Sequence, residues 1–288
     1  MSEPQPPSPY EHKGRVTRAE IVTSAPPDRV WEAWTDPDRL AEWFVDRARG
    51  RVRTGATVTW FFDRFKSSID FAVLAADTPR HLIMRAGAPD GRSFVQEIGI
   101  EREGTGSRVS AAGSGMSRDD EEHEGMVSGW EMALGILKHY LENHFGEPRR
   151  SFFAMQPAPV EYDRIRKFFS EGWYMGQWLT STGSIGEVGE AYRLELRGGD
   201  TMSGVVLAKT SREVALSWEE INGFVELKAF RLGGPGERAV CMRGSGWDMS
   251  SELRLEIERM ANVFVNKLVA ALKEPTQSRA GNGHGAPH

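Results

Sequence analysis

Three groups of side chains in this sequence have the chemistry for proton transfer or metal binding. His81 begins an expected strand, and a histidine near a cavity can act as an acid or base; the alternative that we favour is a surface or hydrogen-bonded histidine. His139 and His144 are five residues apart on an expected helix, so they point in different directions and cannot form an i, i+4 metal pair. The run RDDEEHE at 118–124 suggests a cation site, yet acidic residues are expected wherever a helix begins. We therefore predict no metal site.

The chain lacks the motifs of the common catalytic and cofactor sites. It has no HExxH, no CxxC and no nucleophile elbow. The segments GTG at 104–106 and GGPG at 233–236 lie between expected strands and are typical of hairpin turns rather than phosphate loops. The single cysteine, Cys241, excludes an internal disulfide and cannot by itself form a thiolate metal cluster. We expect no cofactor, and the pattern favours a protein that is not an enzyme without deciding the point.

Aromatic and large apolar side chains are the more informative set. Two of them, Trp60 and Phe62, alternate on one face of an expected strand, and others come from neighbouring strands and from helices. Together they could line an apolar cavity that binds a ligand; the alternative is that they fill the core. The predicted ligand-binding residues are Trp34, Trp43, Trp60, Phe62, Phe71, Met84, Trp130 and Leu134, with His81 as a candidate polar residue of the cavity.

A helix, a sharp corner and a second helix must position the first of these tryptophans. The stretch RVWEAWTDPDRLAEWF at 29–44 begins with helical spacing of apolar residues. Pro37 then disfavours helical geometry at Asp36, while Asp36 can cap a second helix that has Pro37 in its first turn. We expect two short helices joined at Asp36, each with a tryptophan near its inner surface.

Short strand-like segments follow, and a long helix closes this half of the chain. The segments are separated by Gly, Pro or Asp, and short connections favour antiparallel pairing. The helix spans 121–146, with acidic residues in its first turn and one apolar stripe made by Trp130, Leu134, Leu137, Leu141 and Phe145.

The order of elements then repeats. Trp43 lies 135 positions before Trp178, and Leu134 lies 131 positions before Val265, so the offset drifts slowly as diverged tandem copies require. We expect a disordered N-terminal tail at 1–13, domains at 14–147 and 151–274, and a disordered C-terminal tail at 275–288. The linker between the domains is short, so the copies should lie against each other.

The segments APPDRVWEAWTDPDRLAEWF, SRVSAAGSGM and GWEMALGILKHYLE in the first copy resemble the activator of HSP-90 ATPase homologue-like proteins of the START, SRPBCC or Bet v 1-like helix-grip superfamily. The resemblance implies an α+β fold of two tandem helix-grip domains. Each would be an antiparallel sheet wrapped around a long C-terminal helix, with two short helices after the first strand and a cavity inside. Many relatives carry a histidine before the Ser-Gly of the last strand, where this chain has Gly113 and Gly244.

Composition limits the partners and the location. The chain has 288 residues, a formal net charge of −5 and no run of basic residues, which argues against nucleic acid as a partner. It has neither an apolar signal region nor an apolar run that could span a bilayer, so we expect a cytoplasmic protein with no membrane partner. A homodimer is left open.

Three classes of function fit these observations. We predict a non-catalytic protein that binds a small hydrophobic or aromatic molecule, mainly in the first domain. The first alternative is a polyketide cyclase/aromatase-like or hydrolase-type enzyme that uses the same cavity. The second is a chaperone-associated protein, as the family name suggests, although nothing here resembles the separate N-terminal domain that such an activator also needs.

Overall fold

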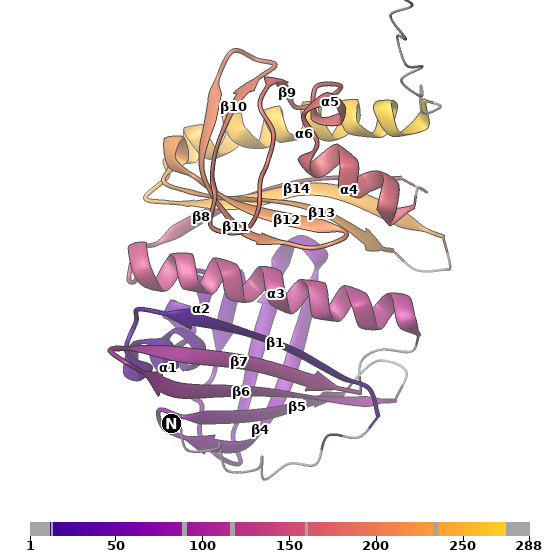
Figure 1. The fold of residues 1–288 in the computed structure, drawn as a ribbon. Helices are drawn as coiled ribbons and strands as arrows, with labels where there is room; N and C mark the ends of the chain where they lie inside the picture. The colour runs from indigo at the N-terminus through magenta and orange to yellow at the C-terminus, as the bar shows by residue number, and fades with distance from the viewer. Residues whose placement is uncertain are drawn as a thin grey trace, which may run out of the picture.

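A computed structural model describes residues 12, 14–87, 91–115, 119–158, 161–232 and 236–274. Apart from His12, the two expected tails lie outside these residues. The described chain contains two seven-stranded antiparallel sheets, each packed with a long helix, which confirms the expected α+β class and its tandem helix-grip arrangement (Figure 1).

The first sheet has the strand order β1-β7-β6-β5-β4-β3-β2, so its two edges are the first two strands in the chain. The long helix α3 (Asp120–Asn143) follows the last strand, and the short helices α1 (Pro27–Thr35) and α2 (Pro37–Ala41) follow the first. The strands are β1 (Val16–Thr23), β2 (Arg47–Arg49), β3 (Thr57–Phe62), β4 (Ser67–Asp77), β5 (His81–Gly87), β6 (Ser93–Glu103) and β7 (Gly106–Ser114), with a 3-10 turn η1 (Asp63–Phe65) between β3 and β4.

The second sheet repeats this order strand for strand, as β8-β14-β13-β12-β11-β10-β9. Its helices are α4 (Tyr162–Ser170), α5 (Gly172–Met175) and the closing helix α6 (Ser251–Lys273). Its strands are β8 (Arg149–Pro157), β9 (Thr180–Thr182), β10 (Ala191–Leu196), β11 (Thr201–Lys209), β12 (Glu213–Trp218), β13 (Gly223–Arg231) and β14 (Arg238–Trp247), with a 3-10 turn η2 (Glu219–Ile221) after β12. The second half therefore begins at Arg149, inside the segment that we expected as a linker.

The expected corner between the short helices is present. The side chain of Asp36 accepts hydrogen bonds from the backbone of Asp38 and Arg39, and Pro37 occupies the first turn of α2. The indole of Trp43 then donates to the Ala33 carbonyl at 3.0 Å. In the second half, Trp178 makes the same contact with Phe168 at 2.9 Å, ten residues back in each case. Trp43 and Trp178, which occupy equivalent positions in the two copies, thus make the same hydrogen bond to the backbone.

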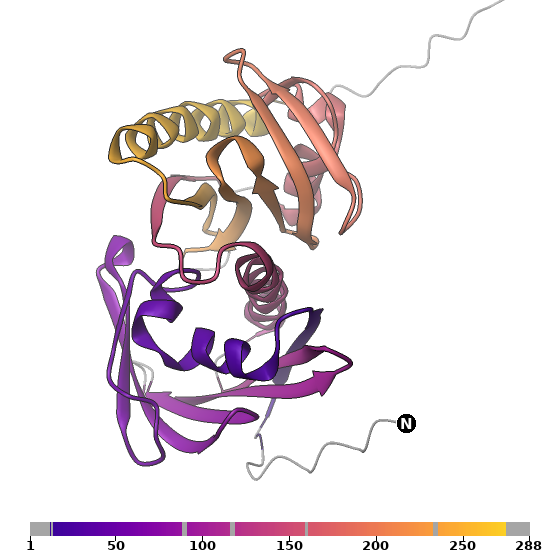
Figure 2. The same ribbon diagram turned by 90° about the vertical axis from the view of Figure 1, so that its left-hand side faces the viewer.

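Helix α3 lies between the two sheets (Figures 1 and 2). It contacts β1 on one side and β11, β12 and β13 on the other, while α6 packs against β8 and β14. The second sheet is therefore covered on both faces. Along β13, Val225 and Leu227 join the core beneath α6, whereas Phe224 joins the core around α3, as the alternation of a strand requires. None of the helices in the described ranges has the length and apolar character of a membrane-spanning segment.

Candidate ligand-binding site between the two halves

The structure brings most of the predicted aromatic residues into one cluster inside the first half. Ring centroids are 4.8 Å apart between Trp34 and Trp43, and 4.6 Å apart between Trp60 and Phe71. Phe44, which the sequence analysis did not assign to binding, connects these pairs through contacts with Trp43, Trp60, Phe62 and Trp130. The buried members of the predicted set are Trp34, Trp43, Trp60, Phe71, Met84, Trp130 and Leu134, whereas Phe62 is half-buried.

A small cavity lies within the first half, beside Phe94, Gly113 and Trp130. It measures about 10 Å³. A volume of that size holds one water molecule.

A much larger cavity, of about 320 Å³, lies between the two halves. Three of the predicted residues, Trp43, Phe62 and Trp130, line it; the other five predicted apolar residues do not. We call it the aromatic cavity, because its lining includes Trp43, Phe44, Phe62, Phe65 and Trp130 from the first half and Phe152, Phe153 and Phe224 from the second.

A second cavity of about 460 Å³ adjoins the first. The two share Phe65, Gly125, Met126, Phe153, Lys228 and Arg243 in their linings. We call the second one the charged cavity, because its lining includes Arg92, Glu121, Glu122, Arg212, Glu213 and Arg231. The two cavities together make a cleft with one apolar end and one charged end.

Glycines on α3 help to create this space. Gly125 and Gly129 are four residues apart on the helix, so they lie on the same face, and both border the aromatic cavity. No atom lies within 4 Å of where a Cβ of Gly129 would be. Gly244, by contrast, has no room for any side chain, because its Cβ would lie 2.1 Å from the Phe224 carbonyl oxygen.

Charged side chains of the second sheet form a network on the floor of the cleft. Glu226 is fully buried, and its Oε2 accepts hydrogen bonds from Nε and Nη2 of Arg243 at 3.0 and 2.7 Å. Lys228 donates to Glu213 at 2.7 Å. Burial raises the pKa of the Glu213 carboxyl. Burial has the same tendency at Glu226, but the cations Arg243 and Lys228 outweigh it and lower the pKa of that carboxyl.

The turn between β3 and β4 extends from the first half to the edge of the aromatic cavity. Arg64 donates to Glu258 on α6 at 2.8 Å, and the ring of Phe65 meets that of Phe153 edge-on at 5.4 Å. Phe65 is 49% exposed. This turn therefore forms part of the cavity wall that both halves share.

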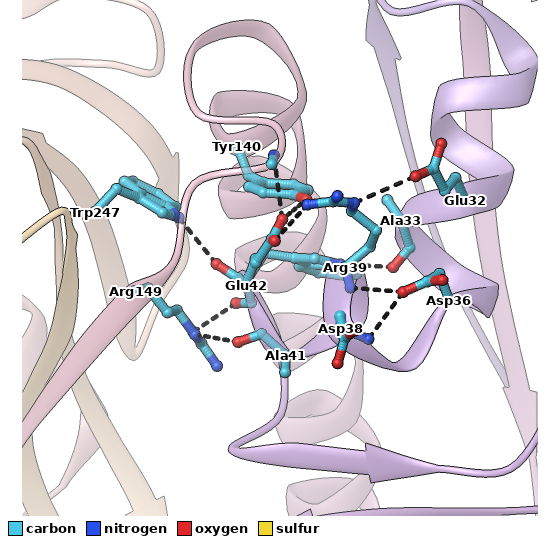
Figure 3. Close-up of polar contacts among 12 residues, drawn as sticks. Glu32, Ala33, Asp36, Asp38, Arg39, Ala41, Glu42, Tyr140, Arg149 and Trp247 are labelled. Atoms are coloured by element: carbon cyan, nitrogen blue, oxygen red, sulfur yellow. Dashed lines mark hydrogen bonds and ion pairs between the residues drawn. The ribbon is translucent and has the colours of Figure 1, made fainter.

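A buried joint holds the halves together next to the cavity (Figure 3). Arg149 donates to the carbonyl groups of Ala41, Trp43 and Val45 at 2.7–2.8 Å. These bonds give hydrogen-bond donors to the carbonyl groups at and just after the C-terminal end of α2. Burial lowers the pKa of the Arg149 guanidinium to about 10, so it stays charged at neutral pH. The indole of Trp247 donates to the Glu42 carbonyl at 2.9 Å.

The carboxylate of Glu42 completes this joint from the first half. It accepts hydrogen bonds from Arg39 at 2.5 Å, from the backbone of Gly146 at 3.1 Å and from the Tyr140 hydroxyl. Burial, with Glu42, raises the pKa of the Tyr140 phenol, which keeps that hydroxyl protonated as a donor.

His81 lies away from both cavities. Its Nε2 is 2.5 Å from a carboxylate oxygen of Glu97, which also contacts His12 at 2.6 Å. The hydrogen-bonded alternative for His81 is thus the one that the structure shows. Within the described residues, no group of three or more His, Cys, Asp or Glu side chains is arranged to hold a metal ion.

Comparison with known proteins gives one family match. The profile described as Activator of Hsp90 ATPase homolog 1-like protein matches residues 24–142, and no curated protein matches the chain. Among solved structures, DynU16, a protein of the dynemicin biosynthetic locus, is 19% identical over 89% of this chain and 97% of its own, with a TM-score of 0.41. The di-domain ARO/CYC BexL from the BE-7585A biosynthetic pathway is 11% identical over 91% of this chain and all of its own, with a TM-score of 0.41.

A third solved structure covers one half only. The Aha1 dimer from Colwellia psychrerythraea is 19% identical over 45% of this chain and 97% of its own, with a TM-score of 0.40. The profile match covers the two short helices, the strands β2 to β7 and nearly all of α3. The first half of this chain therefore matches the AHSA1-like family profile, and the second half repeats its strand order.

Proposed function

We propose that this protein binds a small, largely apolar or aromatic molecule in the aromatic cavity between its halves. The observation that carries the proposal is a cavity of about 320 Å³ whose lining includes aromatic rings from both halves. Known ligand pockets begin at about 300 Å³ and are mostly apolar, with a few polar groups that orient the ligand. A cytoplasmic location and a homodimer stay predictions.

The proposed site differs in place from the one expected inside the first domain. Trp34, Trp60, Phe71, Met84 and Leu134 support the cavity wall from within the core, whereas Phe44, Phe62 and Trp130 border the cavity itself. The second half takes part directly through its outer sheet face. Binding should therefore need both halves.

The enzyme alternative, a cyclase/aromatase-like or hydrolase-type activity, has one observation in its favour. Glu226 is a buried carboxylate in the lining of an aromatic cavity, and its Oε1 has no hydrogen-bond partner among the described residues. A general base must, however, reach the proton that it removes. That oxygen is buried, so we favour binding over catalysis. Nothing in the described residues favours the chaperone alternative.

A neutral fluorescent probe tests the binding proposal. N-phenyl-1-naphthylamine should bind the full chain, with a rise in its emission. Phe62→Ala and Phe153→Ala, one from each half, should each weaken binding about tenfold, because each removes a half-buried ring from the cavity wall. Trp173→Ala is the matched control, since Trp173 is 52% exposed and borders neither cavity.

Two outcomes contradict the proposal. One is that the probe does not bind the folded chain at all. The other is that Phe62→Ala and Phe153→Ala bind the probe as well as the control variant does, which would place any bound probe elsewhere on the molecule.

A further inference from the structure

We propose that the ligand carries one acidic group, a carboxylate, which binds Arg243 where the aromatic and charged cavities meet. This inference rests on the proposed function and narrows it to an apolar or aromatic monocarboxylic acid. The ring or chain of the ligand would lie toward Phe44, Phe62 and Trp130, and its carboxylate toward the charged cavity.

The first argument is which cations of the cleft are already paired. The lining of the aromatic cavity contains four cations, Arg64, Arg149, Lys228 and Arg243. Carboxylates outside this lining pair with two of them, Glu258 with Arg64 and Glu213 with Lys228. An anion is therefore expected to bind where a cation keeps N–H groups free for it.

The second argument is the geometry of Arg243. Its Nε and Nη2 both donate to Oε2 of the buried Glu226, which fixes the plane of the guanidinium. Its Nη1 has no hydrogen-bond partner in the described part of the chain, and its side chain is 42% exposed because it faces the cleft. The guanidinium is thus oriented by one carboxylate and has N–H groups left for a second one. Glu226 acts here as a positioning residue.

Arg149 adds to the preference for an anion. It donates to backbone carbonyl groups and forms no ion pair with any described residue, and Asp46 attracts its charge. An anion bound in the aromatic cavity, which Arg149 lines, would add to that attraction.

The same geometry limits the charge of the ligand to one. The carboxylate of Glu226 stays close to the binding position, and the cations around it lower its pKa, so it is ionised. A dianion such as a phosphate monoester would be repelled by this carboxylate.

Two probes of the same shape test the inference. 2-Naphthoic acid and the neutral 2-naphthamide differ in charge but little in size. Titration of the full chain at pH 7.5, followed by calorimetry or tryptophan emission, should show the acid binding about tenfold more tightly than the amide. Arg243→Gln should remove this preference, so that the acid and the amide bind with similar affinity.

Two further variants keep the test decisive. Arg193→Gln is the matched control, because Arg193 is an exposed cation of the same half that borders neither cavity. If Arg243→Gln leaves Glu226 unpaired and fails to fold, the double variant Glu226→Gln/Arg243→Gln removes both charges, and it should bind acid and amide equally.

The outcomes separate this inference from the proposed function. Equal binding of acid and amide by the unmodified chain overturns the inference but leaves apolar binding standing. A preference for the acid that survives in the Arg243 variants also overturns it. If neither probe nor N-phenyl-1-naphthylamine binds, the proposed function itself fails.

Discussion

The imidazole of His144 lies flat against the indole of Trp247, with 4.0 Å between ring centroids and 9° between ring planes. His144 follows the last turn of α3, and Trp247 ends β14, so this stack joins the two halves of the chain. The ring of His139 lies close to both, with its centroid 4.9 Å from that of His144 and 5.6 Å from that of Trp247. Two histidines thus lie against one buried indole where the halves meet.

Acid should weaken this joint through His139. Burial, with the nearby His144, lowers the pKa of His139 to about 4. Because an unfolded histidine titrates near pH 6.5, the unfolded chain takes up a proton first as the pH falls. The stability that the neutral His139 contributes to the folded chain is fully present above about pH 6.5. As the pH falls toward 4, the free energy of unfolding decreases by about 2 to 3 kcal/mol. Urea unfolding at pH 7.5 and 4.5 measures this loss.

The variant His139→Gln isolates the effect from other titrating groups. Its carboxylates still titrate, so its stability also changes with pH, but it should lose about 2 to 3 kcal/mol less than the unmodified chain between the two pH values. The same pH dependence in both proteins would show that His139 is not held neutral.

Arg149→Met should destabilise the joint by about 2 to 4 kcal/mol. The side chain of Arg149 satisfies three carbonyl groups near the end of α2, and methionine leaves all three without this donor. Arg150→Met is the neighbouring control, because Arg150 is exposed and, among the described residues, donates to the Met249 carbonyl alone. Its cost should stay below about 1 kcal/mol in the same denaturant melts. Similar costs for both variants would mean that Arg149 does not hold the halves together.

Leu134→Ala and Leu137→Ala should each cost about 2 to 5 kcal/mol of stability. Both side chains are fully buried within the core around α3. Lys138→Ala, one position along on the exposed face, should have little effect. Leu134 lies outside the linings of both cavities, so its truncation should change the free energy of unfolding more than the affinity for N-phenyl-1-naphthylamine. If neither Leu134→Ala nor Leu137→Ala lowers the free energy of unfolding, these two side chains do not face the core as described.

The sequence predicts the local elements well, because their signals are local. Pro37 and the capping oxygen of Asp36 define the corner between α1 and α2 without help from the rest of the fold. The repeat of Trp43 at Trp178 likewise predicts a second copy, and both indoles make the same backbone contact. Each of these inferences needs only neighbouring residues or the slowly drifting offset between the two copies.

The site between the halves is not predictable in the same way, because it depends on how two domains pack. The apolar stripe of α3 accounts for its contact with the first sheet, but Ala133 and Ile136 are buried as well and border the aromatic cavity. A helix that is apolar on more than one side is usually covered on more than one side, and that signal was present in MALGIL at 132–137. The small residues Gly125 and Gly129 were a second signal, since they leave space on one face of the helix.

Gly135 marks the closest approach of α3 to the second sheet, and a single methyl group there tests the packing of the halves. A Cβ on Gly135 would lie 2.7 Å from the carbonyl oxygen of Leu207 on β11 and 3.0 Å from the Ala208 Cβ. Because backbone cannot yield as a flexible side chain does, Gly135→Ala should destabilise the chain by about 1 to 3 kcal/mol, despite the better helix propensity of alanine. Gly129→Ala is the control on the same helix, where open space should let alanine stabilise by about 0.5 to 1 kcal/mol. If both variants raise the denaturation midpoint, α3 does not pack against β11 in solution, and the cavity between the halves would not form as described.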